Sequence, residues 1–156
     1  MDPGETKSLD VKCSGDRKLI GGGYQRTTFV SNGGDRITES RAISSNTWRV
    51  TAHADQNFGG ELGGIAYCLR SKKPLLRTVT ATVPVASQEP GSVTTPSCPK
   101  GRVLGFTGFS TDSSDKLVYM GSSINSAGTT TASGFNDAAA LSSPSNLTAY
   151  GYCLKV

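Results

Sequence analysis

The sequence predicts an all-β fold, a β-sandwich or β-prism-like domain built from two pseudo-symmetric repeats. Three observations carry this prediction: a composition poor in helix formers, short alternating runs separated by turn residues, and an internal repeat that includes all four cysteines. Glycine supplies 19 of the 156 residues, and Ser and Thr are abundant, which favours strands and turns. A chain of this length is long enough to bury one shared core.

Short runs with the periodicity of strands follow one another along the chain. Residues 47–54 place an apolar side chain at every second position, and residues 77–85 and 147–156 do the same. Clusters of Gly, Ser, Asn, Asp and Pro separate such runs, as is typical of turns. About ten short strands at this spacing are typical of a sandwich or a prism. No helix is required, and residues 137–141 are the best candidate for a single helical turn.

The internal repeat is clearest at the cysteines. Cys13 and Cys68 are 55 residues apart, as are Cys98 and Cys153, and an offset of 85 relates the two copies. Neighbouring residues align at this offset, matching Arg17 with Arg102, Leu19 with Leu104, Gly23 with Gly108 and Tyr24 with Phe109. Equal end spacing with a diverged middle indicates a duplicated supersecondary unit. We therefore predict a first repeat at 8–78 and a second at 79–156, packed as one compact domain.

Three consecutive glycines, residues 21–23, stand in a segment otherwise suited to a strand. Only Gly23 is kept in the second copy, where the two preceding positions hold Phe106 and Thr107. A phosphate-binding loop requires a following helix and usually a Lys before Ser or Thr, and neither signal is present. We interpret the segment as a strand in which glycine permits a bulge, a bend or a close neighbour.

Four cysteines in two equivalent pairs allow three disulfide connectivities. The repeat favours Cys13 with Cys68 and Cys98 with Cys153, so that each unit is closed by its own bridge. Zinc binding is not supported, because each cysteine is isolated and His53 is the only histidine. Disulfides indicate an oxidising compartment, and we predict a secreted or extracellular protein.

Four short motifs carry a resemblance to known proteins. They are "LIGGGY" at 19–24, "WRVTA" at 48–52, "AYCL" at 66–69 and "CPKG" at 98–101. Together they resemble tandem repeats in secreted bacterial proteins, many of them actinobacterial and functionally uncharacterised. The likeness covers nearly all of both copies, but the first copy has "CSGD" and the second lacks the Trp and the full glycine run. The plan of β-repeats also resembles the vitelline-membrane outer-layer prisms, and neither resemblance supplies catalytic residues.

The positive charge lies in the first half of the chain. Residues 1–78 hold 12 Lys and Arg against 8 Asp and Glu, whereas residues 79–156 hold 4 against 4. The densest cluster is Arg70, Lys72, Lys73 and Arg77. It is either a patch for an anionic partner or, as we favour, a solvated connector whose lysines protect a sheet edge. We expect no nucleic-acid partner, because aromatic residues do not interleave with this cluster, and no membrane insertion, because no apolar run approaches the ~20 residues that span a bilayer.

The residue types and their spacing give little support for a catalytic function. A Ser-His-Asp hydrolase would have to use His53, with Asp55 and Arg49 nearby, and a single histidine on the polar face of a strand is more often solvated. The spacing of the carboxylates selects no pair for glycoside hydrolysis. We therefore predict no enzymatic activity, no cofactor and no metal, and rank a hydrolase third among the possible functions.

A binding function fits better, because two turn clusters combine rings with polar groups. The candidate binding residues are Arg49, His53, Asn57, Phe58, Phe135, Asn136 and Asp137. Sugars bind by stacking on such rings and by hydrogen bonding to fixed polar groups, although the alternative is that most rings lie in the core. We predict a lectin-like protein that binds carbohydrate or a cell-surface component. A protein-interaction role, as a protease inhibitor or structural surface protein, is the main alternative, and the sequence indicates no oligomeric state.

Peptide mapping without reductant tests the proposed pairing. We expect it to recover Cys13 linked to Cys68 and Cys98 linked to Cys153, because each repeat is then closed on itself. Recovery of Cys13 linked to Cys98, or of a free thiol, would overturn the assignment.

Overall fold

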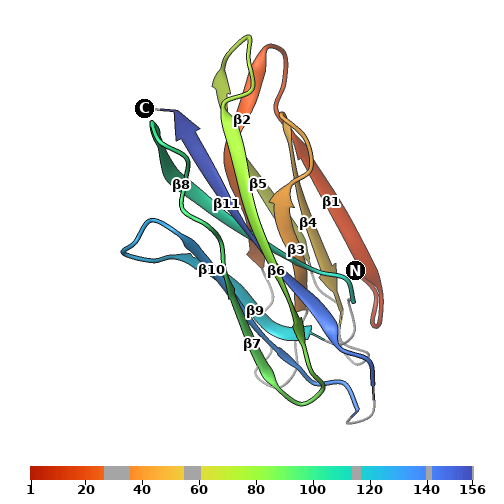
Figure 1. Cartoon of the computed structure of the whole chain (residues 1–156). Helices are drawn as coiled ribbons and strands as arrows, with labels where there is room; N and C mark the ends of the chain where they lie inside the picture. The colour runs from red at the N-terminus through yellow and green to blue at the C-terminus, as the bar shows by residue number, and fades with distance from the viewer. Residues whose placement is uncertain (27–35, 55–60, 114–116, 140–141, 156) are drawn as a thin grey trace.

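The computed structural model describes residues 1–26, 36–54, 61–113, 117–139 and 142–155, and these residues form eleven strands and no helix (Figure 1). The strands are β1 (Thr6–Lys12), β2 (Arg17–Arg26), β3 (Arg36–Ala42), β4 (Thr47–His53), β5 (Leu62–Arg70), β6 (Leu76–Val85), β7 (Pro90–Thr94), β8 (Arg102–Thr111), β9 (Leu117–Ile124), β10 (Thr130–Asn136) and β11 (Ser145–Lys155). The predicted all-β class is confirmed. Residues 137–139 are not helical, and the rest of the predicted helical turn lies outside the described residues.

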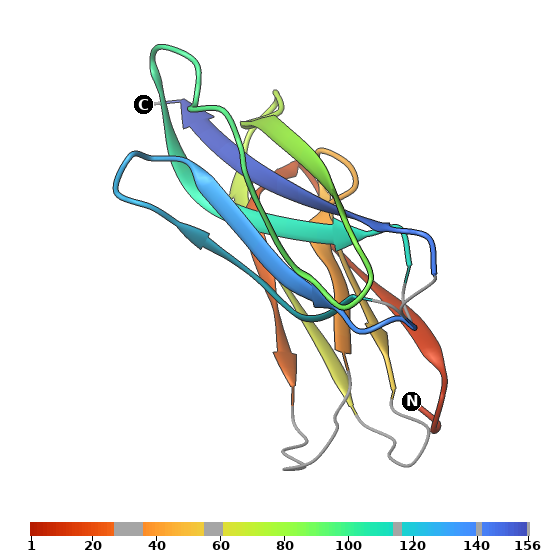
Figure 2. The same cartoon turned by 60° about the horizontal axis from the view of Figure 1, so that its bottom comes forward.

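The strands form three antiparallel sheets (Figure 1, Figure 2). The largest has the order β1-β4-β3-β8-β11-β6, and the smaller ones are β7-β10-β9 and β2-β5. Both small sheets pack on the same face of the large one. A side chain added at Gly64 of β5 would meet Val11 and Val50, and one added at Gly91 of β7 would meet Val85.

Strand pairing in the first unit is repeated in the second. The sets β1-β4-β3 and β2-β5 correspond to β7-β10-β9 and β8-β11. In β2 the register shifts between Leu19 and Gly21, and in β8 the shift falls at Gly105, the residue that the offset of 85 pairs with Ile20. The repeat therefore extends to strand order and to the position of a bulge, while a symmetry axis that relates the units stays a prediction.

One strand lies outside this correspondence. β6 pairs with β11 from Leu76 to Val85, so the predicted boundary between residues 78 and 79 falls within a strand of the larger sheet. In the described part of the chain, no strand occupies the matching edge of β5.

Each unit is closed by one disulfide. The bridges join Cys13 to Cys68 and Cys98 to Cys153, the pairing that the repeat favours, and no cysteine is free. Each one ties the residues before the second strand of a unit to its last strand. In the chain-entropy model a loop of this length contributes roughly 4 kcal/mol to the free energy of unfolding.

The core follows from the alternation along the strands. On β4, Trp48, Val50 and Ala52 are buried, as their period of two predicts, and the polar residues between them lie on the opposite face. β11 departs from the expected pattern of one buried face, since Ala149 and Cys153 are buried as well as Tyr152. The reason is that Trp48 and Ala42 of the first unit contact Tyr152 and cover it on the second face of β11.

The three consecutive glycines have different roles. A Cβ at Gly21 would overlap the ring of Phe106, and one at Gly22 would overlap the ring of Trp48. Nothing lies within 4 Å of a Cβ at Gly23. The first two glycines therefore allow two aromatic rings to reach the backbone of β2, which confirms the interpretation of a close neighbour.

Substitution of single glycines in β2 tests this difference. Gly22→Ala should lower the free energy of unfolding by about 3 kcal/mol, because the methyl group overlaps the Trp48 ring. Gly23→Ala is the matched control, and it should be neutral or add up to about 1 kcal/mol, because alanine restricts the unfolded chain. Chemical denaturation followed by circular dichroism measures both values. Equal effects of the two substitutions would contradict the assignment.

Candidate binding surface

Six polar side chains line up across the large sheet, one from each strand. In the order of the strands they are Ser8, Thr51, Glu39, Ser110, Thr148 and Thr82, and each is the register partner of the next. We call this set the hydroxyl row. Because neighbouring strands lie about 4.8 Å apart, the row is about 24 Å long. It draws on both repeats and lies on the face opposite Trp48 and Val50, away from the two small sheets.

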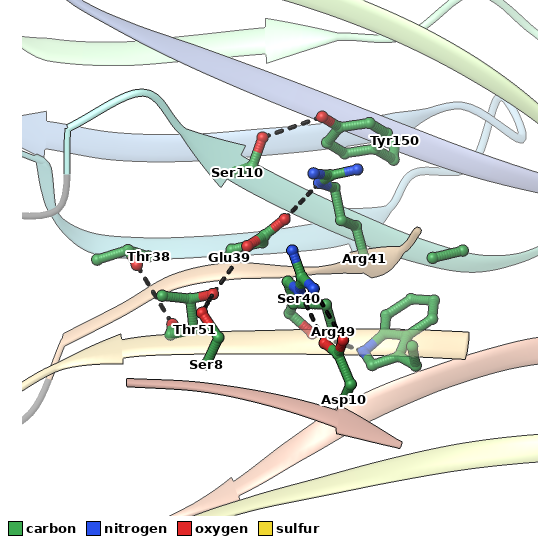
Figure 3. Close-up of polar contacts among 12 residues, drawn as sticks. Ser8, Asp10, Thr38, Glu39, Ser40, Arg41, Arg49, Thr51, Ser110 and Tyr150 are labelled. Atoms are coloured by element: carbon green, nitrogen blue, oxygen red, sulfur yellow. Dashed lines mark hydrogen bonds and ion pairs between the residues drawn. The ribbon is translucent and has the colours of Figure 1, made fainter. Parts of the chain in front are cut away.

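The hydroxyl row is internally hydrogen-bonded. Thr51 Oγ1 donates to Glu39 Oε2 at 2.8 Å, and Ser8 Oγ lies 2.8 Å from Thr51 Oγ1, so the proton between the two hydroxyls belongs to Ser8 (Figure 3). At the other end of the row, the hydroxyls of Thr82 and Thr148 are 2.9 Å apart. Ser8 and Thr82 are exposed and the four central members are half-buried, so the row is open to a ligand along its length.

Arg41 and Tyr150 connect the two repeats beside the row. Arg41 Nε lies 2.6 Å from Glu39 Oε1, and the Arg41 guanidinium lies 5.5 Å from the centre of the Tyr150 ring (Figure 3). The Tyr150 hydroxyl is 3.0 Å from Ser110 Oγ. A cation over an aromatic face is attracted by the ring quadrupole, so Arg41 bridges the carboxylate of one repeat to the ring of the other.

Arg49, one of the predicted binding residues, is the register partner of Arg41 and lies on the same side of the row. Its Nε and Nη2 atoms donate to the two carboxylate oxygens of Asp10 at 2.7 and 2.8 Å. These hydrogen bonds hold the pKa of Asp10 below its ordinary value and raise the pKa of Arg49. Arg49 therefore presents a neutralised pair to solvent rather than a free cation.

His53 and Asp137 are predicted binding residues from different repeats, and both lie toward the same end of the large sheet. His53 Nδ1 is 2.8 Å from Thr6 Oγ1, and Arg36 is its register partner on β3. Arg36 Nη2 lies 3.3 Å from Asp137 Oδ2, which brings the second repeat to this end. The predicted residues Asn57 and Phe58 lie outside the described residues.

Asn136 is fully buried, and its side chain forms hydrogen bonds with backbone groups of two segments. Its Nδ2 donates to the carbonyl of Val85 at 2.8 Å, and its Oδ1 accepts from the N–H of Ala138 at 3.1 Å. The side chain is thus committed to joining β6 to the end of β10, and a surface ligand has no access to it. Phe135 is half-buried beside it.

The basic cluster lies at the connection from β5 to β6. Arg70 Nε lies 3.3 Å from Asp16 Oδ2, and Lys72, Lys73 and Arg77 are exposed. This arrangement fits the solvated connector better than a focused anion site. Among the residues that the structure describes, no group of three or more His, Cys, Asp or Glu is placed to hold a metal, and no helix is long and apolar enough to span a membrane.

The hydroxyl row was not foreseen from the sequence. The alternation of polar residues on each strand is visible there, but the partners Glu39 and Ser110 are joined only by the tertiary register. A surface hollow of about 320 Å³ lies next to one end of the row, lined by Met1, Lys7, Ser8, Leu9, Glu61 and Leu62.

Comparison of the chain with protein-family models, with curated proteins and with solved structures found no match. The function is therefore inferred from the geometry of the surface.

Titration of Asp10 tests the electrostatics of this surface. We expect a carboxyl pKa below the ordinary 3.8, returning to it in Arg49→Gln, because the two hydrogen bonds stabilise the ionised form. Because the pKa of Asp10 is lower in the folded than in the unfolded protein, the pair stabilises the folded protein at pH values above the ordinary pKa. This contribution to the free energy of unfolding is lost as the pH falls through the pKa of the folded protein. For an exposed pair the contribution is below about 1 kcal/mol. Carboxyl carbon NMR measures the titration, and identical pKa values in both proteins would refute the pairing in solution.

Proposed function

We propose that the chain is a secreted, non-enzymatic protein that binds an uncharged polysaccharide along the hydroxyl row. The observation that carries the proposal is the row itself, a line of hydroxyls and one carboxylate across six strands and both repeats. Sugars present hydroxyls that both donate and accept hydrogen bonds, and hydroxyl side chains can do the same. At about 24 Å, the row is long enough for several sugar units in an extended chain.

The charges beside the row favour an uncharged ligand. Glu39 is paired with Arg41, and Asp10 is paired with Arg49, so each of these charges is compensated within the surface. An acidic glycan would need unpaired cations to offset its loss of hydration. The half-buried ring of Tyr150 supplies apolar surface against which a sugar can pack, beside the Arg41 guanidinium that lies over the ring.

Secretion is supported by the two disulfides, which persist in oxidising compartments and are rare in a reducing cytosol. The alternative of a protease inhibitor has less support. The basic segment that an inhibitor would present, residues 69–77, begins in β5 and ends in β6, and only residues 71–75 lie between the two strands. A protruding, extended loop of the kind that a protease recognises would need more free chain.

A polysaccharide screen with matched variants tests the proposal. The oxidised protein should bind at least one neutral polysaccharide in a panel that also contains acidic ones. Thr82→Val combined with Thr148→Val keeps the shape and strand propensity of both residues but removes two hydroxyls from the row. Since a hydrogen bond contributes about 0.5–1.5 kcal/mol, affinity should fall roughly tenfold or more.

A second threonine pair provides the control. Thr94 and Thr131 are hydrogen-bonded across β7 and β10 at the same 2.9 Å, on a sheet that does not contain the row. Thr94→Val combined with Thr131→Val should leave affinity unchanged. An equal loss in the two double variants, or exclusive binding of acidic polysaccharides, would contradict the proposal.

A further inference from the structure

The outer edge of β5 differs from the same edge of its counterpart β11. β11 lies between β8 and β6, whereas in the described part of the chain β5 pairs with β2 alone. The two strands otherwise match: Cys68 faces Leu19 as Cys153 faces Leu104, and the register shift falls at the same place. The edge of β5 therefore has the backbone geometry that β6 uses on β11, but none of the described strands lies on it.

The outer face next to this edge is apolar. Ile65, Tyr67 and Leu69 are 37%, 47% and 54% exposed, whereas Tyr152, the counterpart of Tyr67, is fully buried. Phe106 stacks on one side of Tyr67, with ring centres 5.5 Å apart, and covers only part of this face.

The edge also lacks the usual protection against strand pairing. Natural sheet edges commonly carry charged residues or proline, which prevent pairing with other chains. β1 carries Lys7 and Lys12, and β6 carries Arg77 and Pro84, but no charged residue or proline lies between Leu62 and Leu69. Up to its last residue, Arg70, β5 is therefore a template for a further strand.

We propose that the edge of β5 binds an extended segment of a partner protein by adding it to the β2-β5 sheet as an antiparallel strand. The repeat indicates the chemistry of that segment. β6 places Val79, Ala81 and Val83 on the side of the core and threonines between them. Val79 and Ala81 pair with the two residues of β11 whose counterparts in the first repeat are Ala66 and Gly64. A guest strand in the same register would place residues like Val79 and Ala81 opposite these counterparts. The guest is thus an extended peptide with small apolar residues at every second position and uncharged polar residues between them.

This edge is separate from the hydroxyl row. Gly64 and Gly22 face Val50 and Trp48, so β2-β5 covers the apolar face of the large sheet, while the row lies on the opposite face. Strand addition at β5 can therefore be tested independently of polysaccharide binding.

The test uses the full oxidised chain and a synthetic peptide with the sequence of residues 78–83, in which threonines alternate with Val79, Ala81 and Val83, blocked at both ends. Amide NMR and hydrogen exchange should show saturable binding, with changes concentrated in residues 62–70. A strand that pairs on one side uses every second N–H. Of two control peptides, N-methylated at alternate residues in opposite phase, one should therefore bind normally and the other at least tenfold more weakly.

Two protein variants complete the test. Ile65→Lys adds a charge beside the edge and should weaken peptide binding at least tenfold. Val103→Lys, at a residue 51% exposed on β8 and paired with β11, should not. Four results would each overturn the proposal: no binding, changes centred on β11 or another strand, equal binding of both methylated peptides, or self-association through β5 that excludes the peptide. The last of these would assign the edge to a second copy of the chain.

Discussion

The packing of Tyr152 against the first repeat is the contact on which the rest of the structure depends. Its ring centre lies 5.2 Å from that of Trp48, and its hydroxyl accepts a hydrogen bond from the N–H of Ala42 at 2.8 Å. The residue is fully buried, and this burial raises the pKa of Tyr152 above its ordinary value. Between the repeats, β3 and β8 share only two register pairs, so ladder hydrogen bonds alone join the units weakly. This contact, with the ring contacts of Tyr24 with Phe109 and Tyr67 with Phe106, keeps the large sheet and the hydroxyl row continuous.

Glycine makes this contact possible. Gly21 and Gly22 leave room for Phe106 and Trp48 at the backbone of β2, and Gly108 lets the second unit approach the carbonyl of Ser40. On the outer face of β2-β5, Phe106 lies against Gly21 and stacks on Tyr67, which stays exposed. These glycines thus account for the tight junction between the units.

Local pattern and tertiary register account for different parts of the structure. The alternation along β4, the pairing of the cysteines and the structural role of the glycines follow from short-range pattern and from the repeat, and all three are visible in the sequence. The hydroxyl row is not visible in the sequence, because the alignment of Glu39 with Ser110 depends on the register between β3 of one unit and β8 of the other. Asn136 was expected at the surface and is buried, because the polar side chain satisfies backbone groups at the end of β10. A polar residue in a turn cluster can serve a ligand or the chain itself, and only the fold distinguishes the two.

The central claim is that the two repeats fold as one unit through the Tyr152 contact. Trp48 is the only tryptophan and lies in the first repeat, in contact with Tyr152 of the second, so its fluorescence reports on the first repeat and on this contact. The most direct measurement removes the bridge of the second repeat, with Cys98→Ser and Cys153→Ser, and follows denaturation by Trp48 fluorescence and circular dichroism together. Coupled repeats predict one transition, seen at the same denaturant concentration by both probes and shifted to lower concentration from that of the parent protein. A Trp48 transition that stays at its original position, while circular dichroism shows two steps, would contradict the account.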